Sequence, residues 1–143
     1  ITRSVLIAII SIAVFSIIVE IPINNIFYIF IFGFLSAFIL GSLGFITGLW
    51  AEKFDHTATV TNFIITPLSF LSGVFYSIDR LPSLFQTISH INPFFYMIDG
   101  FRYGFLGASD GSISFGIIYL TILSFVMWFI AFYLYRKGYK IKS

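Results

Sequence analysis

The stretch from Thr66 to Arg102 reads TPLSFLSGVFYSIDRLPSLFQTISHINPFFYMIDGFR and decides how the chain folds. It begins inside a long apolar run, passes an Asp-Arg pair at 79–80, and is broken by Asn92-Pro93. Apolar residues recur at helical spacing on both sides of that break. Each of the two segments is shorter than the about 20 residues that a helix needs to cross a bilayer. We therefore predict an interfacial or re-entrant helical hairpin over residues 81–106.

Composition places the rest of the chain in a membrane. Of the 143 residues, 59% are hydrophobic and 10% are charged, whereas soluble domains carry about 25% charged residues. An isolated span in lipid must be helical, because an open strand leaves its backbone polar groups unpaired. We predict an all-α integral membrane protein, a single transmembrane domain over 1–143. It has four transmembrane helices at about 4–19, 26–50, 57–78 and 112–135, and the hairpin is external.

The chain begins at Ile1, and no small-residue cleavage site follows Arg3, so a signal peptide is not expected. We expect the sequence to be the C-terminal part of a longer chain. The absence of cysteine excludes disulfides, thiolate metal ligands and a cysteine nucleophile. A net charge of +2 is too small to indicate a nucleic-acid partner.

The basic residues predict the orientation of the spans. With four spans, six of the eight Lys and Arg residues fall on one side: Arg3, Lys53, Arg136, Lys137, Lys140 and Lys142. Only Arg80 and Arg102 fall on the other side. By the positive-inside rule the six face the cytoplasm, so both ends of the chain are cytoplasmic and Asp79–Ser112 is outside.

Two of the spans contain residues that alter helix packing. In the second, small residues recur at four-residue spacing (Gly33, Ala37 and Gly41, then Gly44 and Gly48), which favours close approach of another helix. In the third, Pro67 removes a backbone donor and crowds the carbonyl of Phe63. That proline fits either a simple kink or a functional break in the helix.

Motifs for nucleotide binding and hydrolysis are absent from the sequence: it contains no G-x-x-x-x-G-K-[ST], no H-E-x-x-H and no G-x-S-x-G. His56 and His90 fall on opposite sides of the predicted membrane, so they form no metal pair. Asp99 and Arg102 share a helix face at i, i+3 and can neutralise each other. The pair fits a structural role in the hairpin or a functional role in the membrane. Considered as a pair alone, Arg102→Ala is expected to do more harm than Asp99→Ala, and removing both charges should restore part of the loss.

The run T-P-L-S-F-L-S-G-V-F-Y, followed by L-P and by N-P-F-F-Y-M-I-D-G-F-R-Y-G-F-L-G, resembles the signature of the type-2 ABC exporter permeases. The likeness is close over residues 57–107. The motif positions in register are Pro67, Ser72, Gly73, Leu81, Pro82, Asn92, Pro93, Tyr96, Asp99 and Arg102. The resemblance implies spans three to six of a six-span permease in the cell (inner) membrane, with 81–106 as an outer gate hairpin.

The same resemblance implies partners and a mechanism. Such permeases pair as dimers within membrane lipid and bind a separate cytoplasmic ATP-binding-cassette ATPase subunit. The loop Glu52, Lys53, Phe54 and Asp55 is then a minor ATPase contact, and the main coupling loop precedes Ile1. The chain itself is expected to be no enzyme and to need no cofactor or metal. The apolar spans favour an amphipathic or lipid-like cargo, but lipid-facing surface has the same composition.

Two rival functions remain open at this point. An integral-membrane lipid-modifying enzyme would use Asp99 or His90 as acid or base, and it needs a second polar group within hydrogen-bond reach. A passive membrane assembly subunit is less consistent with the interrupted third span and the paired hairpin segments.

The predicted topology is testable by cysteine labelling, because the chain has no cysteine of its own. In intact cells, a membrane-impermeant maleimide should label a Ser83→Cys variant and should spare a Ser143→Cys variant until the cells are opened. Labelling of both positions from the same side would contradict four spans.

Overall fold

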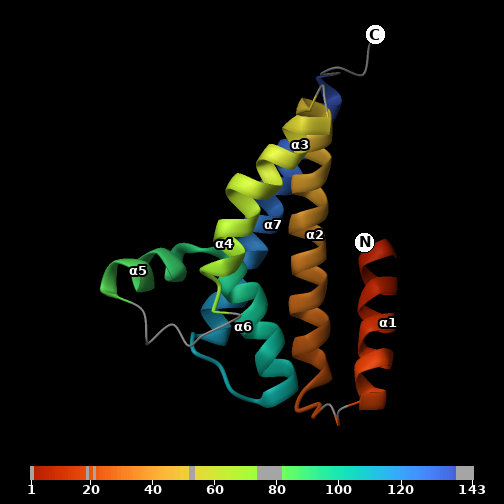
Figure 1. Cartoon of the computed structure of the whole chain (residues 1–143). Helices are drawn as coiled ribbons and strands as arrows, with labels where there is room; N and C mark the ends of the chain where they lie inside the picture. The colour runs from red at the N-terminus through yellow and green to blue at the C-terminus, as the bar shows by residue number, and fades with distance from the viewer. Residues whose placement is uncertain (1, 19, 21, 52–53, 74–81, 138–143) are drawn as a thin grey trace.

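The computed structural model describes residues 2–18, 20, 22–51, 54–73 and 82–137 (Figure 1). Within these ranges the chain is helical and contains no strand, which confirms the all-α prediction. The elements are α1 (Thr2–Ile18), α2 (Ile26–Trp50), α3 (Phe54–Val60), the π-helical turn η1 (Thr61–Ile65), α4 (Thr66–Phe70), α5 (Ser83–Ile91), α6 (Pro93–Leu106) and α7 (Ile113–Arg136).

Two of the described helices are long and apolar enough to cross a membrane, namely α2 with 25 residues and α7 with 24. Shorter apolar helices cover Leu6–Ile18 and Ala58–Phe70, within the first and third predicted spans. Parts of those two predicted spans lie outside the described residues, at 19 and 74–78. The four-span arrangement therefore stays a prediction.

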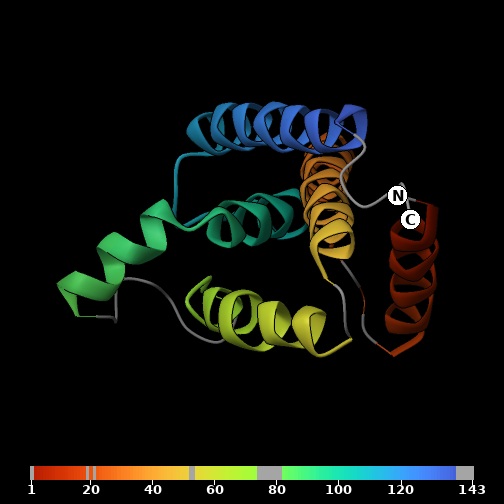
Figure 2. The ribbon, with the colours of Figure 1, turned by 90° about the horizontal axis from the view of Figure 1, so that it is seen from above.

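The helices run alternately up and down. In Figure 1, α2 and α7 rise side by side, while the α3–η1–α4 segment descends. Helix α6 packs against both α2 and α7, and α1 stands apart at one side (Figure 1). Viewed from above, α5 projects away from the other helices (Figure 2). The hairpin segments α5 and α6 thus have different surroundings: α6 is packed and α5 is peripheral.

The helix boundaries follow local capping chemistry. The side chain of Asn25 accepts a hydrogen bond from the amide of Phe27 at 3.1 Å and begins α2, since Asn is a favoured N-cap. Asn92 caps α6 in the same way, and Pro93 occupies its first position. Gly107 ends α6 in the left-handed conformation with φ +73°, which glycine adopts without steric cost.

The core lies where α6 meets α2 and α7. Its buried apolar side chains are Phe32, Ile39, Phe95, Tyr96, Met97 and Leu120. The ring of Phe32 lies directly against Gly100, where an added Cβ would be 2.2 Å from Phe32 Cε1. One turn on, a Cβ at Gly104 would be 2.8 Å from the backbone nitrogen of Ile29. Glycine at these two positions is what allows α6 to approach α2 so closely.

Among the described residues, the glycines of the predicted packing face on α2 meet another helix only at Gly33, where Phe101 of α6 lies 3.5 Å from an added Cβ. Apart from the neighbouring backbone of α2 itself, no atom of the described residues lies within 4 Å of a Cβ added at Gly41, Gly44 or Gly48. The close helix contact is made instead by the small-xxx-small pair Gly100 and Gly104 on α6. The spacing rule identifies helices able to approach closely, but it cannot tell which of several such faces has a neighbour.

The predicted proline irregularity in the third span is present in an altered form. The backbone stays helical from Phe54 to Phe70, and the wide η1 turn lies just before Pro67. Both the amide and the hydroxyl of Thr66 donate to the carbonyl of Thr61, the hydroxyl at 2.9 Å. A π turn of this kind inserts an extra residue into the helix and is common at functional positions. Here it leaves the helix continuous around a residue that lacks an amide donor.

Replacing Gly100 by Ala should destabilise the folded protein, because the new methyl group would overlap the Phe32 ring. Overpacking of this kind typically costs about 1–3 kcal/mol. Gly44→Ala is the matched control on α2. Ala keeps the small residue that a closely packed helix needs and favours helix over Gly, so the change should be neutral or stabilising by up to about 1 kcal/mol. Melting temperatures of the full-length protein in detergent measure both effects. Equal losses at the two positions would contradict the packing described.

Candidate functional site

The Asn92 corner between α5 and α6 is built from buried polar side chains. Asn92 is 1% exposed, and its carboxamide oxygen accepts from the amide of Phe94 at 3.0 Å. Its amide group donates to the carbonyl of Leu68 in α4 at 2.6 Å. Ser89, which is fully buried, donates to the carbonyl of Leu71 at 2.9 Å. The last turn of α4 therefore receives two hydrogen bonds from a corner about twenty residues further along the chain.

Two tyrosine hydroxyls also donate hydrogen bonds at the Asn92 corner, to carbonyls at the end of α5. The hydroxyl of Tyr96 donates to the carbonyl of His90 at 2.9 Å, and the hydroxyl of Tyr119 in α7 donates to the carbonyl of Ile91 at 2.7 Å. These carbonyls belong to the last residues of α5, which have no partner within their own helix. The rings of Tyr96 and Tyr119 also contact each other, with centroids 5.3 Å apart.

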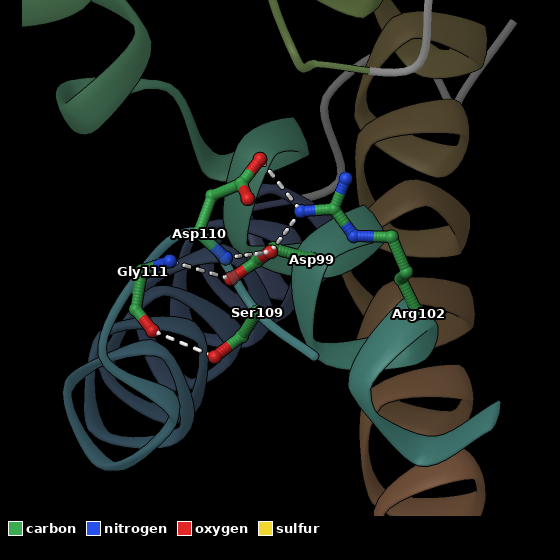
Figure 3. A network of polar contacts seen from close by, with 5 residues as sticks. All are labelled: Asp99, Arg102, Ser109, Asp110 and Gly111. Carbon is green, nitrogen blue, oxygen red and sulfur yellow. Dashed lines mark hydrogen bonds and ion pairs between the residues drawn. The ribbon is translucent and has the colours of Figure 1, made fainter. Parts of the chain in front are cut away.

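Below the corner, the Asp99 carboxylate organises the loop from α6 to α7 (Figure 3). Asp99 is 2% exposed and accepts hydrogen bonds from the amides of Asp110 at 2.8 Å and Gly111 at 3.0 Å. Arg102 donates to the same carboxylate at 2.6 Å. Three donors thus surround one buried carboxylate. The i, i+3 pair predicted from the sequence is confirmed, and it is part of a larger network.

Arg102 links the carboxylate to a second acid. Its Nη2 atom lies 2.6 Å from Asp99 Oδ1 and 2.8 Å from Asp110 Oδ2. Burial lowers the pKa of Arg102, but hydrogen bonds to Asp110 and Asp99 outweigh burial and raise the pKa overall. The guanidinium therefore stays charged, and one cation is shared by two carboxylates.

The C-terminal end of α6 is capped by the backbone amides of Asn24 and Asn25, which lie between α1 and α2. The amide of Asn24 donates to the carbonyls of Gly104 and Phe105, each at 3.1 Å, and the amide of Asn25 donates to Gly104 at 2.8 Å. These carbonyls are among those that a helix end leaves unpaired. Among the described residues, no buried side-chain nitrogen or oxygen lacks a hydrogen-bond partner.

The structure brings together most of the predicted motif residues. Ser72 and Gly73 are buried at the end of the third span, with Gly73 at φ +79°, and Ser72 donates to the carbonyl of Ser69. Asn92, Pro93, Tyr96, Asp99 and Arg102 follow on the corner and on α6. Pro67 and Pro82 are exposed, and Leu81 lies outside the described residues.

The predicted ATPase contact is described only in part. Phe54 and Asp55 are the first two residues of α3, while Glu52 and Lys53 lie outside the described residues. Among the described residues, no group of three or more His, Cys, Asp or Glu side chains could hold a metal ion.

Sequence reasoning missed four residues of this site, namely Ser89, Asp110, Gly111 and Tyr119. Each meets its partner across 11 or more residues of chain, so no helical spacing could indicate the contact. A weak signal was available for Asp110-Gly111, because this polar turn immediately precedes the final span.

The hydrogen-bond geometry bears on one of the two candidate groups of the enzyme alternative. Asp99 has both carboxylate oxygens occupied by donors and is nearly inaccessible, whereas His90, the other candidate acid or base, is exposed. General acid–base catalysis needs a group within reach of the substrate. A hollow of about 370 Å³ does lie between α2 and α7, but the residues that line it are uncharged: Phe34, Leu35, Phe38, Thr121, Ser124, Phe125 and Trp128.

Comparison with known proteins identifies the family. The sequence model that describes the ABC-2 type transporter matches residues 1–106. The chain belongs to the ABC-2 type transporter family. The match includes the Asn92 corner and the Asp99–Arg102 pair, so the resemblance inferred from the motif is confirmed. Asp110, Gly111 and Tyr119 lie beyond the matched residues.

Individual members of the ABC-2 type transporter family are similar to this chain. The inner membrane transport permease YadH of Escherichia coli (strain K12) is 40% identical over 111 residues, which are 76% of this chain and 43% of that protein. Nodulation protein J of Rhizobium leguminosarum bv. viciae is 31% identical over 96 residues, 67% of this chain and 37% of that protein. The chain thus spans less than half the length of these relatives. No solved structure matches it.

The Asp99 network makes a prediction opposite to the one from the charge pair alone. Asp99→Ala leaves two loop amides without their acceptor and should cost about 1–3 kcal/mol for each amide that stays unpaired, while Arg102 keeps its bond to Asp110. Arg102→Ala leaves those amides bonded to Asp99 and should cost about 1.5–3 kcal/mol, the value of hydrogen bonds to charged groups. The double variant should stay as unstable as Asp99→Ala, because the amides remain unpaired.

Thermal unfolding of the full-length protein in detergent measures all three variants. A larger loss for Arg102→Ala than for Asp99→Ala, or recovery in the double variant, would show that the pair rather than the loop amides dominates.

Proposed function

We propose that the chain is part of the membrane-spanning permease subunit of an ATP-binding-cassette exporter. In this proposal it lines the translocation pathway and is driven by a separate ATPase subunit. Membership of the ABC-2 type transporter family carries the proposal. The likeness to an inner membrane transport permease supports a location in the inner membrane.

We propose a topology in which both chain ends face the cytoplasm. The end of α2, the start of α3 and the end of α7 lie at one end of the molecule, while α6 lies toward the other and α5 lies about half-way along (Figure 1). Arg136 is in the last turn of α7, at the end that the positive-inside rule assigns to the cytoplasm. The pairing of Arg102 with two acids lowers the cost of placing a cation in the opposite half.

The hairpin α5–α6 is the proposed outer gate. Helix α6 is packed into the bundle, and α5 exposes Phe85, Ile88 and Ile91. A short helix with an apolar face of this kind suits the membrane interface. Since Asp99, Arg102 and Asp110 are bonded to one another, we propose an amphipathic rather than a highly charged cargo.

The proposed partners are a cytoplasmic ATPase subunit, a second permease copy and membrane lipid. The ATPase contact is the segment from Glu52 to Asp55, which joins α2 to α3 at the proposed cytoplasmic end. The unoccupied face at Gly41, Gly44 and Gly48 can accept a helix from outside this chain.

The division of labour between permease and ATPase is testable by nucleotide binding. The full-length permease, purified alone, should bind no fluorescent ATP analogue stoichiometrically, because this chain contains no phosphate-binding loop. The permease isolated gently from its native membrane should carry a Walker-type ATPase, and Phe54→Ala should weaken that association. Stoichiometric nucleotide binding by the permease alone would refute the proposal.

A further inference from the structure

The end of α4 is joined to the hairpin by buried hydrogen bonds. The carbonyls of Leu68 and Leu71 lie in and just after α4, where the helix can no longer supply donors. Asn92 and Ser89 supply them, at 2.6 and 2.9 Å. Both side chains are at most 1% exposed, so water cannot replace either bond without opening the corner.

The same corner is also fixed to α7. Tyr119 donates from α7 to the carbonyl of Ile91, and Tyr96 donates from α6 to the carbonyl of His90. We call the side chains of Ser89, Asn92, Tyr96 and Tyr119 the corner clamp. Helix α5 projects away from the bundle (Figure 2), so these bonds attach it by its C-terminal end.

The helical segment from α3 to α4 can bend just before the residues that the clamp holds. The π turn η1 lies directly before α4, and π turns and prolines are common sites of helix bending. Helix α4 meets α6 near the corner. Helix α4 is hydrogen-bonded to the hairpin at its C-terminal end. At its other end it is joined to α3 through the π turn, where a helix can bend.

We propose that the corner clamp makes the end of α4 and helix α5 a single mechanical unit, with Ser89 and Asn92 joining the two helices and Tyr119 as the residue that positions the unit on α7. A displacement of α4 then reaches the hairpin through the two buried hydrogen bonds from Ser89 and Asn92. The clamp itself follows from the contacts; its role in transmitting motion during transport rests on the proposed function. Neither Ser89 nor Tyr119 belongs to the motif by which the family was recognised.

The clamp is testable by hydrogen exchange of the full-length permease in lipid nanodiscs. Ser89→Ala and Tyr119→Phe each remove one hydroxyl donor and little volume. Asn92→Ser keeps an N-cap for α6 but is too short to reach Leu68. In each variant the amides of residues 83–91 should exchange roughly tenfold faster than in the unmodified protein, which corresponds to about 1.4 kcal/mol.

Matched controls remove hydroxyl groups elsewhere. Ser36→Ala loses a bond within its own helix, to the carbonyl of Phe32, and Tyr135→Phe alters an exposed tyrosine on α7. Neither should change exchange in α5. Unchanged exchange in α5 of all three clamp variants, or acceleration spread equally over α2 and α7, would overturn the clamp.

Whether a movement of α4 reaches α5 is tested in the complex with the ATPase subunit, by comparing hydrogen exchange with and without ATP. In the unmodified complex, exchange in residues 66–73 and 83–91 should change together on adding ATP. In the double variant Ser89→Ala, Asn92→Ser, which loses both bonds to α4, residues 66–73 should still respond while residues 83–91 do not. Tyr119→Phe, which loses only the bond from α7 to Ile91, should leave the two segments responding together. If α5 still follows α4 in the double variant, the transmission is refuted. If the unmodified permease binds no ATPase, the proposed function fails, and with it the transmission, whereas exchange in the isolated permease still decides the clamp.

Discussion

The ends of the helices around α6 find hydrogen-bond partners outside their own helix, and these contacts shape the molecule there. The end of α6 receives the amides of Asn24 and Asn25. The end of α5 receives Tyr96 and Tyr119. The loop before α7 donates its amides to Asp99. Leaving such groups unpaired costs several kcal/mol each where water is absent, so these contacts determine which elements must stay together.

The constraint also explains why polar residues are concentrated in so apolar a chain. Asp99 is nearly inaccessible, yet its position is favourable because Arg102 and two backbone amides complete its coordination. Asn92 serves two helices at once, as a cap for α6 and as a donor to α4. These residues stabilise a particular arrangement of helices, and they leave no free acid or base at Asp99. The polar contacts of the site therefore join helices to one another, which is a structural arrangement.

Local features of the fold could be predicted from the sequence, because their causes lie within a few residues. The helical class, the break at Asn92-Pro93 and the Asp99–Arg102 pair all follow from composition or short spacing. The family was recognised because its motif residues stand at fixed separations in one stretch. Two helices, α5 and α6, lie within the predicted hairpin, while a re-entrant hairpin and its position in a membrane stay predictions.

Contacts that depend on the arrangement of distant segments could not be predicted. Gly44 and Gly104 both follow the small-xxx-small pattern, but only Gly104 has a helix against it. Nothing in the sequence around Tyr119 distinguishes it from the other aromatic residues of an apolar span. Its hydrogen bond to Ile91 depends on α7 lying beside the Asn92 corner. The π turn before Pro67 was also missed, because proline chemistry predicts a disturbance without specifying its form.

The most direct measurement is residue-resolved amide exchange in the loop between α6 and α7 of the unmodified, full-length protein. Residues 108–110 are exposed, and an exposed loop ordinarily exchanges fast. If buried Asp99 holds the loop, the amides of Asp110 and Gly111 should exchange much more slowly than that of Ala108 beside them. Equal, fast exchange at all three amides would show that the carboxylate does not hold the loop, and would contradict the role assigned here to the ends of the helices.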